Sequence, residues 1–105
     1  MIINLTGITV KVFDEVDGAL LATFNPDNRI ARVELKSSRG DPICGIPVKY
    51  GHSEVMDLPL EEKDTYYIVD QYVKLARQER QDLLTIENGA YILGEDWIEC
   101  HFLVQ

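Results

Sequence analysis

Two arginines and three aromatic residues are the side chains whose types best suit a chemical task in this chain. Arg32 lies in the middle of a predicted strand, and Arg80 follows a predicted helix on its core-facing side. A guanidinium group binds phosphate through two parallel hydrogen bonds, and an aromatic ring stacks on a base. Together with Tyr50, Tyr72 and Trp97, these arginines predict a site for a small phosphorylated nucleotide.

Each of these residues also has a structural interpretation. Arg80 can form an ion pair with Asp82, two positions later. In a domain of 105 residues, an aromatic side chain more often belongs to the core than to a stacking platform. The net charge of −8 disfavours a phosphate at long range, so arginines that bind one must be partly buried and oriented. The sequence leaves the ion pair and the nucleotide site as alternatives.

The residue patterns of common enzymes are missing from the sequence. The 7 glycines are scattered singly at predicted turns, so they form no glycine-rich phosphate loop. His52, Ser53 and Glu54 are adjacent, but neighbours along a strand point to opposite faces. The same argument separates Cys100 from His101 as ligands of one metal ion. We therefore expect a protein that is not an enzyme, with no catalytic residues, no metal and no cofactor.

Composition and charge limit the class of protein. A chain of 105 residues with 46% hydrophobic residues fits a single globular domain, residues 1–105. Its 18 acidic residues outnumber the 10 basic ones, so general nucleic-acid binding is not expected. No apolar run approaches the ~20 residues that cross a bilayer, and no secretory signal opens the chain. We expect a cytoplasmic protein with no membrane partner, in which Cys44 and Cys100 are buried reduced thiols.

Alternating apolar and polar residues predict an α+β fold, mainly an antiparallel β meander with one short helix. The segments with strand character are 8–12, 19–24, 31–35, 43–50, 66–69, 83–86, 90–93 and 97–104. Residues 36–42 are predicted as a polar loop and Gly51-His52 as a turn, whereas Asn88-Gly89 is a strong hairpin signal. Asp70 is a good N-cap for a helix over residues 71–79.

The last predicted strand is apolar on both faces. Its outer face carries Trp97, His101 and Leu103, which are too large to leave in water unless the helix covers them. We therefore expect the protein to form a homo-oligomer.

Several different short motifs are distributed over most of the chain. They are Asn4-Leu5-Thr6, Ala22-Thr23-Phe24 with Pro26, Ile30-Ala31-Arg32-Val33, Gly45-Ile46-Pro47-Val48, Val55 to Pro59, Tyr67-Ile68-Val69 and Arg80-Gln81-Asp82-Leu83. Together they resemble a family of small uncharacterised proteins of bacterial, prophage and phage genomes that begin Asn-Leu-Thr-Pro-His. The family's Pro-His is Gly7-Ile8 here, so no role for that histidine carries over. The family's serine after Tyr-Ile-Val is Asp70 here. The resemblance implies a phage or prophage setting and brings no established activity.

In such a setting, the sequence favours a non-enzymatic accessory protein in the host cytoplasm. It would counter a host defence by sequestering a small nucleotide signal in an oligomeric assembly. One alternative is an inhibitor that covers a host protein with an acidic face, since the acids gather within residues 54–64 and 87–99. Another alternative is a minor virion-associated structural protein.

Overall fold

A computed structural model gives the fold and describes residues 1–92 and 94–105. Strands account for 47% of the chain and helix for 6%, so the predicted mostly-β class with one short helix is confirmed. The elements in chain order are β1 (Ile2–Asn4), β2 (Thr9–Phe13), β3 (Leu20–Phe24), β4 (Arg32–Arg39), β5 (Lys49–Met56), β6 (Tyr66–Ile68), α1 (Gln71–Ala76), β7 (Leu83–Glu87), β8 (Ala90–Tyr91), β9 (Trp97–Cys100) and β10 (Phe102–Val104). The predicted strand 90–93 includes Leu93, which lies outside the described residues.

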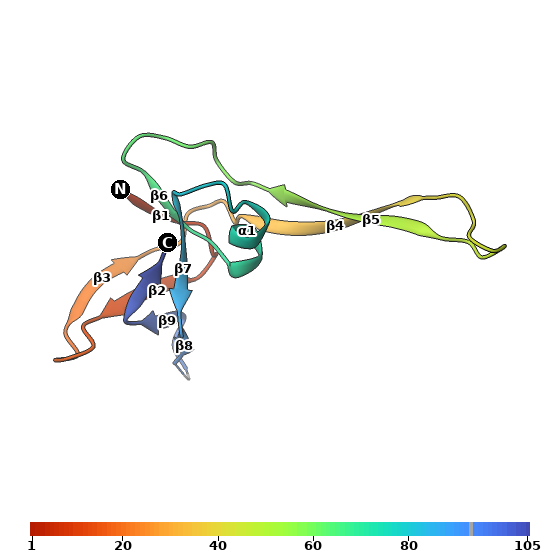
Figure 1. The fold of residues 1–105 in the computed structure, drawn as a ribbon. Coiled ribbons are helices and arrows are strands. Elements are labelled where there is room, and N and C mark those ends of the chain that lie inside the picture. Colours follow the sequence, from red (N-terminus) through yellow and green to blue (C-terminus); the bar gives the residue numbers. More distant parts are fainter. Residues whose placement is uncertain (93) are drawn as a thin grey trace.

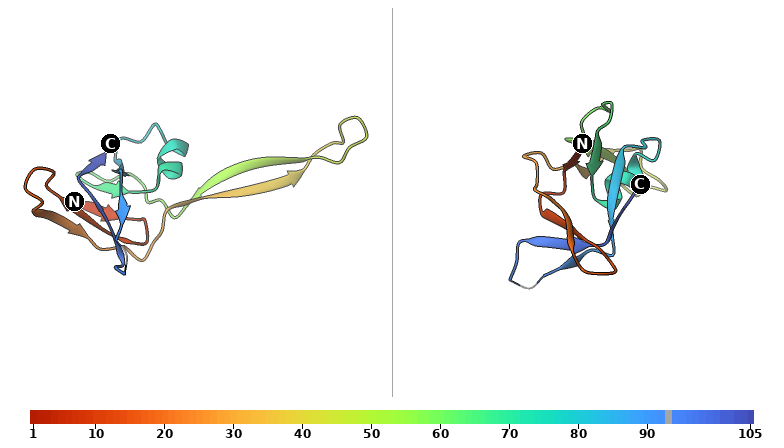
Figure 2. Two further views of the ribbon diagram at one scale, coloured as in Figure 1. Left: turned by 90° about the horizontal axis from the view of Figure 1, so that it is seen from below. Right: turned by 90° about the vertical axis from the view of Figure 1, so that its left-hand side faces the viewer.

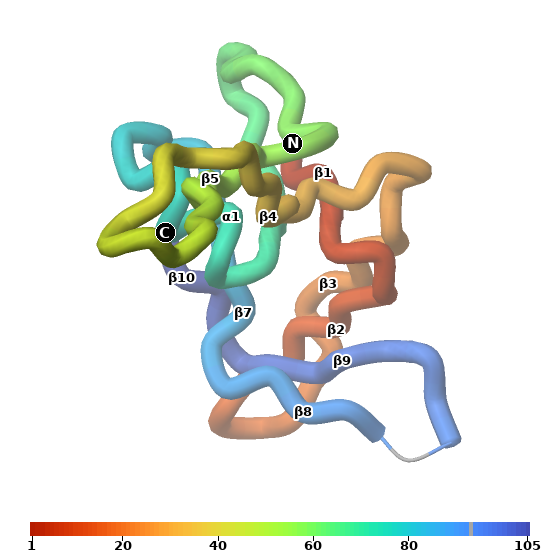
Figure 3. Tube along the Cα trace, turned by 90° about the vertical axis from the view of Figure 1, so that its right-hand side faces the viewer, coloured from red at the N-terminus to blue at the C-terminus, as the bar shows by residue number. Residues whose placement is uncertain are grey.

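Two four-stranded sheets make up the body of the protein. One has the order β1-β6-β7-β10 and the other the order β3-β2-β9-β8. The chain passes from one sheet into the other where β7 leads to β8 and where β9 leads to β10. A β-bridge between Asn4 and Pro26 joins β1 to the chain just after β3. This bridge connects the edge strand of the first sheet to the edge of the second sheet. Figure 3 views the molecule from the end of its long β4–β5 hairpin and shows β8 and β9 on the opposite side of the body from β1.

The predicted antiparallel meander is confirmed for the consecutive pairs β2–β3, β4–β5 and β8–β9 and is wrong for the other strand partners. Three pairs are parallel, namely β1 with β6, β6 with β7 and β2 with β9. β3 and β4, which follow one another in the chain, belong to different sheets. Alternation identifies a strand and its buried face, but it carries no information about a partner as distant as Tyr66 is from Ile2.

Two apolar clusters form the core of the body. The first gathers residues at or next to β1, β4, β6, α1 and β7: Leu5, Ala31, Tyr67, Val69, Val73 and Leu83. The second joins β2 to β9 through Val10, Val12 and Cys100. Cys100 is buried as predicted, whereas Cys44 is exposed, which corrects that part of the thiol prediction.

The helix begins where the sequence predicts and ends early. The Asp70 carboxylate accepts a hydrogen bond from the backbone N–H of Val73 at 2.9 Å, as an N-cap does. The helix covers Gln71–Ala76 instead of residues 71–79, because Arg77 already leaves helical geometry with a φ of −131°. No helix in the described part of the chain is long and apolar enough to cross a membrane.

A long hairpin, which we call the arm, projects from the body. It comprises residues 32–56, and within the described part of the chain β4 and β5 pair only with one another. Figures 1 and 2 show it extending to one side, with both chain termini in the body. The molecule therefore measures 63 Å along its longest axis and 24 Å along its shortest.

The arm corrects three sequence predictions. β4 runs through the predicted loop 36–42 as far as Arg39, and Gly51-His52 lies within β5. The predicted strand 43–50 contains a tight turn instead, closed by hydrogen bonds of 3.0 and 2.9 Å between Ile43 and Ile46. Its central residues, Cys44 and Gly45, have φ values of 50° and 77°, as a type I′ hairpin turn requires.

Two further predictions near the C-terminus are wrong. Asn88-Gly89 does not close a hairpin, because β7 pairs with β10 and β8 pairs with β9. A side chain at Gly89 would come within 2.8 Å of both Ile86 and Ile98, so the chain bends tightly against the sheet there. The predicted strand 97–104 breaks at His101, and Leu103 packs on the second core cluster instead of an outer face.

Candidate functional site: the arm

The arm has one face without charged residues along most of its length. The register places Val33 opposite Val55, Leu35 opposite Ser53 and Ser37 opposite Gly51 on this face. We call these six residues the smooth face. Val33 and Val55 pack against the first core cluster, whereas Leu35, just beyond them, is 87% exposed. The smooth face thus continues the apolar core outward into solvent.

The opposite face of the arm is polar and internally paired. Arg32 bonds to both Glu34 and Asp57, and the Lys36 ammonium lies 3.0 Å from Glu54. The hydrogen bond from Lys36 lowers the pKa of the Glu54 carboxyl below its ordinary value. Such exposed pairs contribute little to stability, but they satisfy the charges of this face in water. The smooth face is therefore the better docking surface.

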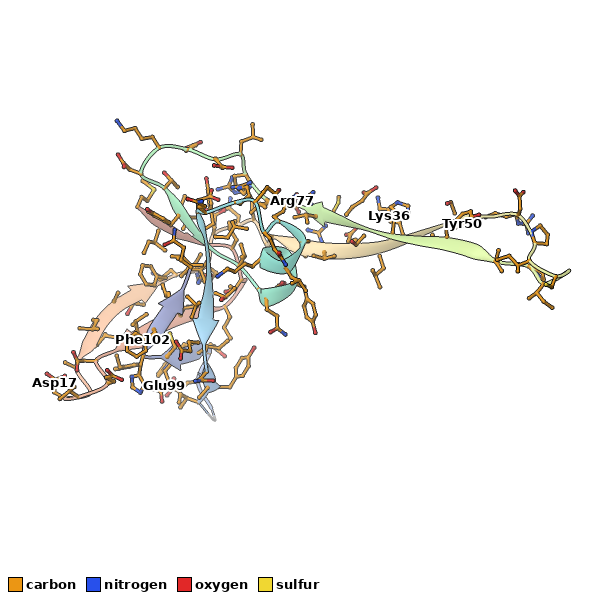
Figure 4. The ribbon with its side chains drawn as sticks, in the orientation of Figure 1. Asp17, Lys36, Tyr50, Arg77, Glu99 and Phe102 are labelled. Carbon is orange, nitrogen blue, oxygen red and sulfur yellow. The ribbon has the colours of Figure 1, made fainter. Side chains whose placement is uncertain are left out.

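The outer half of the arm is basic and ends in an aliphatic tip. Segment 36–52 holds three basic residues and one acidic one, whereas the rest of the chain holds seven basic and seventeen acidic residues. At the tip, Ile43 and Ile46 are 62% and 63% exposed. Tyr50 lies over Gly40, where an added Cβ would be 2.6 Å from the ring. Figure 4 labels Lys36 and Tyr50 along this part of the arm.

A pocket lies in the body at the end remote from the arm. It encloses about 380 Å³ and is lined by Phe13, Gly18, Asn88, Ala90, Glu99, Cys100 and His101. We call it the end pocket. The Nδ1 atom of His101 lies 2.9 Å from the carbonyl oxygen of Phe13, which fixes one wall. In Figure 4, Asp17 and Glu99 mark this end, opposite to the arm.

The predicted ligand residue Arg80 is engaged by the protein itself. Its Nε and Nη2 atoms donate to the two carboxylate oxygens of Asp82 at 2.9 and 2.7 Å. Its Nη1 atom donates to the carbonyl oxygen of Pro59 at 2.9 Å. The hydrogen bond from Arg80 holds the pKa of the Asp82 carboxyl below its ordinary value. This geometry matches the ion pair that the sequence left as an alternative to a phosphate site.

The other predicted ligand residues are dispersed over the fold. Arg32 and Tyr50 belong to the two strands of the arm, with Arg32 at its base and Tyr50 on its outer half. Tyr72 is exposed on α1. The Trp97 ring, on β9, has the Lys11 ammonium 3.6 Å from its centroid, and its indole N–H is buried with no hydrogen-bond partner in the described residues. The structure therefore does not bring the five residues together in one copy.

The apolar surface that the sequence placed on the last strand lies elsewhere. Trp97 is half-buried, and Leu103 belongs to the second core cluster. Exposed aliphatic residues lie on the arm at Leu35, Ile43 and Ile46, and others are scattered over the body, such as Val16, Leu60 and Leu75. One signal could have located the tip, because Pro42 and Pro47 flank a glycine-containing turn with an isoleucine on each side.

Comparisons of the chain with protein-family models, curated proteins and solved structures find no match.

Proposed function

We propose that this protein is a non-enzymatic subunit of a homo-oligomeric assembly, in which the arm of each copy binds a neighbouring copy. The resemblance to phage and prophage proteins supports a role as a minor virion-associated structural protein. This proposal develops the structural alternative that the sequence left open.

The observation that carries the proposal is the exposed arm. A two-stranded ribbon without a covering layer is marginally stable in water, yet β4 and β5 each run for 8 residues. Each strand also has one edge that pairs with no other strand of the described residues, and such an edge is a template for pairing with another chain. A neighbouring copy that covered the smooth face would bury Leu35 and order the ribbon.

Leu35→Glu is expected to weaken self-association by at least about tenfold, since it places a charge on the surface to be buried. Light scattering across a micromolar concentration series would measure the effect. Leu60→Glu is the matched control, because Leu60 is 85% exposed in the β5–β6 loop and should leave assembly unchanged. A wild-type protein that stays monomeric at high micromolar concentration would contradict the proposal.

A second candidate function, capture of a small phosphorylated nucleotide between copies, is favoured by the composition of the outer arm. Arg39 and Lys49 lie opposite one another there and form no ion pair among the described residues, and Tyr50 offers an exposed ring beside them in the chain. Two copies could bring such groups together around a phosphate.

Nucleotide capture would show as a rise in melting temperature with cyclic or ADP-ribose-type nucleotides. The rise should disappear in Arg39→Ala/Lys49→Ala, because this variant lacks the two charges that would bind the phosphate. It should persist in Arg29→Ala, because the Arg29 guanidinium already pairs with Asp27 at 2.8 Å. If no nucleotide shifts the wild-type melting temperature, this second candidate is wrong.

A further inference from the structure

We propose that the tip of the arm binds the end pocket of the next copy, so that copies associate head to tail. The inference rests on the proposed function and specifies the surface that the arm contacts. It concerns a second copy of this chain as the only partner.

Charge is the first support for this pairing. The outer arm, segment 36–52, has a net charge of +2 from its three basic residues and one acidic residue. The end pocket is lined by Glu99, and its lining residues Gly18 and Asn88 are close in the chain to Asp17 and Glu87. No ion pair among the described residues involves these three acids. Lys36 pairs with Glu54, so the arm brings two cations without an ion pair among the described residues, Arg39 and Lys49, to these three carboxylates.

Charge also separates the end pocket from two hollows around the helix. The hollow beside α1 is lined by Lys74, and the one below the helix is lined by Lys74 and Arg80. Both would repel Arg39 and Lys49 of an approaching arm. A third hollow is lined by Asp70, but that carboxylate already caps α1. The end pocket combines an acidic residue with the apolar side chains of Phe13 and Ala90.

The shape of the tip is the second support. A two-residue turn makes the tip narrow, and it presents the side chains of Ile43 and Ile46 next to one another. Gly18 has open space around its Cβ position, so the rim of the pocket is unobstructed there. The end pocket, with a volume of about 380 Å³, can accept two aliphatic side chains. The isoleucines would bury apolar surface while the arm's cations meet the acidic rim.

The tip and the end pocket lie at opposite ends of the molecule (Figure 4). Copies that point in the same direction repeat this heterologous contact from one copy to the next and form a ring or a filament. Two copies that point in opposite directions would instead exchange both tips in a closed dimer, which the length of a cross-linked ladder distinguishes. The association rate should fall as ionic strength rises, since the contact is steered by charge.

A charge exchange tests this contact. Arg39→Glu/Lys49→Glu reverses the charge of the arm, and Asp17→Lys/Glu87→Lys reverses the two exposed acids that adjoin the pocket residues Gly18 and Asn88 in the chain. Each variant alone is expected to raise the dissociation constant at least about tenfold in low salt. An equimolar mixture of the two should recover wild-type assembly, because each arm then meets a pocket of opposite charge. Glu62→Lys/Glu79→Lys is the matched control, with the same change in net charge at two exposed acids elsewhere.

The outcomes separate this inference from the proposed function. Monomeric wild type would overturn both. If wild type assembles and Leu35→Glu disrupts it, but the pocket-reversed variant assembles normally, the arm binds elsewhere and only this inference fails. Failure of the mixture to recover would also overturn the inference, provided that circular dichroism shows both variants folded.

A cross-linking measurement keeps the test decisive if a reversed variant does not fold. Cys44 is exposed at the tip and Cys100 is buried, so a short bismaleimide should react selectively at the tip. Ala90→Cys places a second thiol in the end pocket, and Leu60→Cys places one outside it. A ladder of covalent oligomers with Ala90→Cys alone supports the contact. Equal ladders with both variants, or none with either, would contradict it.

Discussion

Replacing Asn4 with aspartate is expected to lower the free energy of unfolding by about 3 kcal/mol. Asn4 is 2% exposed, and its amide nitrogen donates to the carbonyl oxygens of Ile8 and Phe24 at 2.7 and 2.9 Å. Its side-chain oxygen accepts from the backbone N–H and the hydroxyl of Thr6 at 3.0 and 2.6 Å. Aspartate has the same shape, but it would direct a carboxylate oxygen at two carbonyl oxygens in a buried place.

The pH dependence of this variant identifies the cause. The folded protein would raise the pKa of the new carboxyl, because burial and two facing carbonyls favour its protonated form. The penalty should therefore be full at pH 7 and become smaller as the pH falls through that raised pKa. Urea unfolding of wild type and Asn4→Asp at pH 7 and at about pH 4 measures both values. A difference from wild type below about 0.5 kcal/mol at pH 7 would contradict the assigned hydrogen bonds.

The structural role of Asn4 also bears on the resemblance to the phage and prophage family. Two of the motifs that carry it, Asn4-Leu5-Thr6 and Arg80 to Leu83, donate hydrogen bonds to distant parts of the body, from Asn4 to Phe24 and from Arg80 to Pro59. The hydrogen bonds that the Asn4 amide donates join the turn after β1 to the end of β3. These motifs are accounted for by the fold, without a ligand.

The parts of the fold that the sequence predicted correctly are those with a buried periodic face or a local hydrogen bond. Val10 and Val12 alternate with polar residues and are buried in β2, and Asp70 caps α1. The predicted ion pair of Arg80 with Asp82 is also local, since it spans two positions. Strand partners depend on distant contacts, so the parallel pairs of the body could not be predicted.

The arm could not be predicted because it has almost no core to bury. Apolar alternation arises when one face of a strand packs on a core, and beyond Val33 and Val55 the arm has none. Ser37 and Gly51 face one another within the ribbon, so small polar residues and a glycine indicated loops where strands exist. The same lack of a core makes the arm the candidate interaction surface. Leu35 indicates an interaction surface only once the structure shows that its side chain is exposed.

Arg80→Ala is expected to lower the free energy of unfolding by about 2–3 kcal/mol whether or not a nucleotide is present. The side chains of Arg80 and Asp82 are each 11% exposed, so the variant leaves a nearly buried carboxylate without its partner. It also removes the donor to the Pro59 carbonyl, which ties the β5–β6 loop to the chain after α1. Arg29→Ala is the matched control, because Arg29 pairs with an aspartate two positions away but is 48% exposed, and its loss should have a much smaller effect.

The sign of the pH dependence follows from the lowered pKa of Asp82 in the folded protein. A carboxyl with a lowered folded pKa contributes stability above its unfolded pKa, near about 4, and loses it as the pH falls through the folded value. The stability difference between wild type and Arg80→Ala should therefore be full at pH 7 and narrow below about pH 4. Chemical unfolding at pH 7, pH 5 and pH 3 would measure it. A variant that keeps the wild-type melting temperature but loses stabilisation by a nucleotide would instead identify Arg80 as a ligand residue, and the ion pair would then be a resting contact that a phosphate displaces.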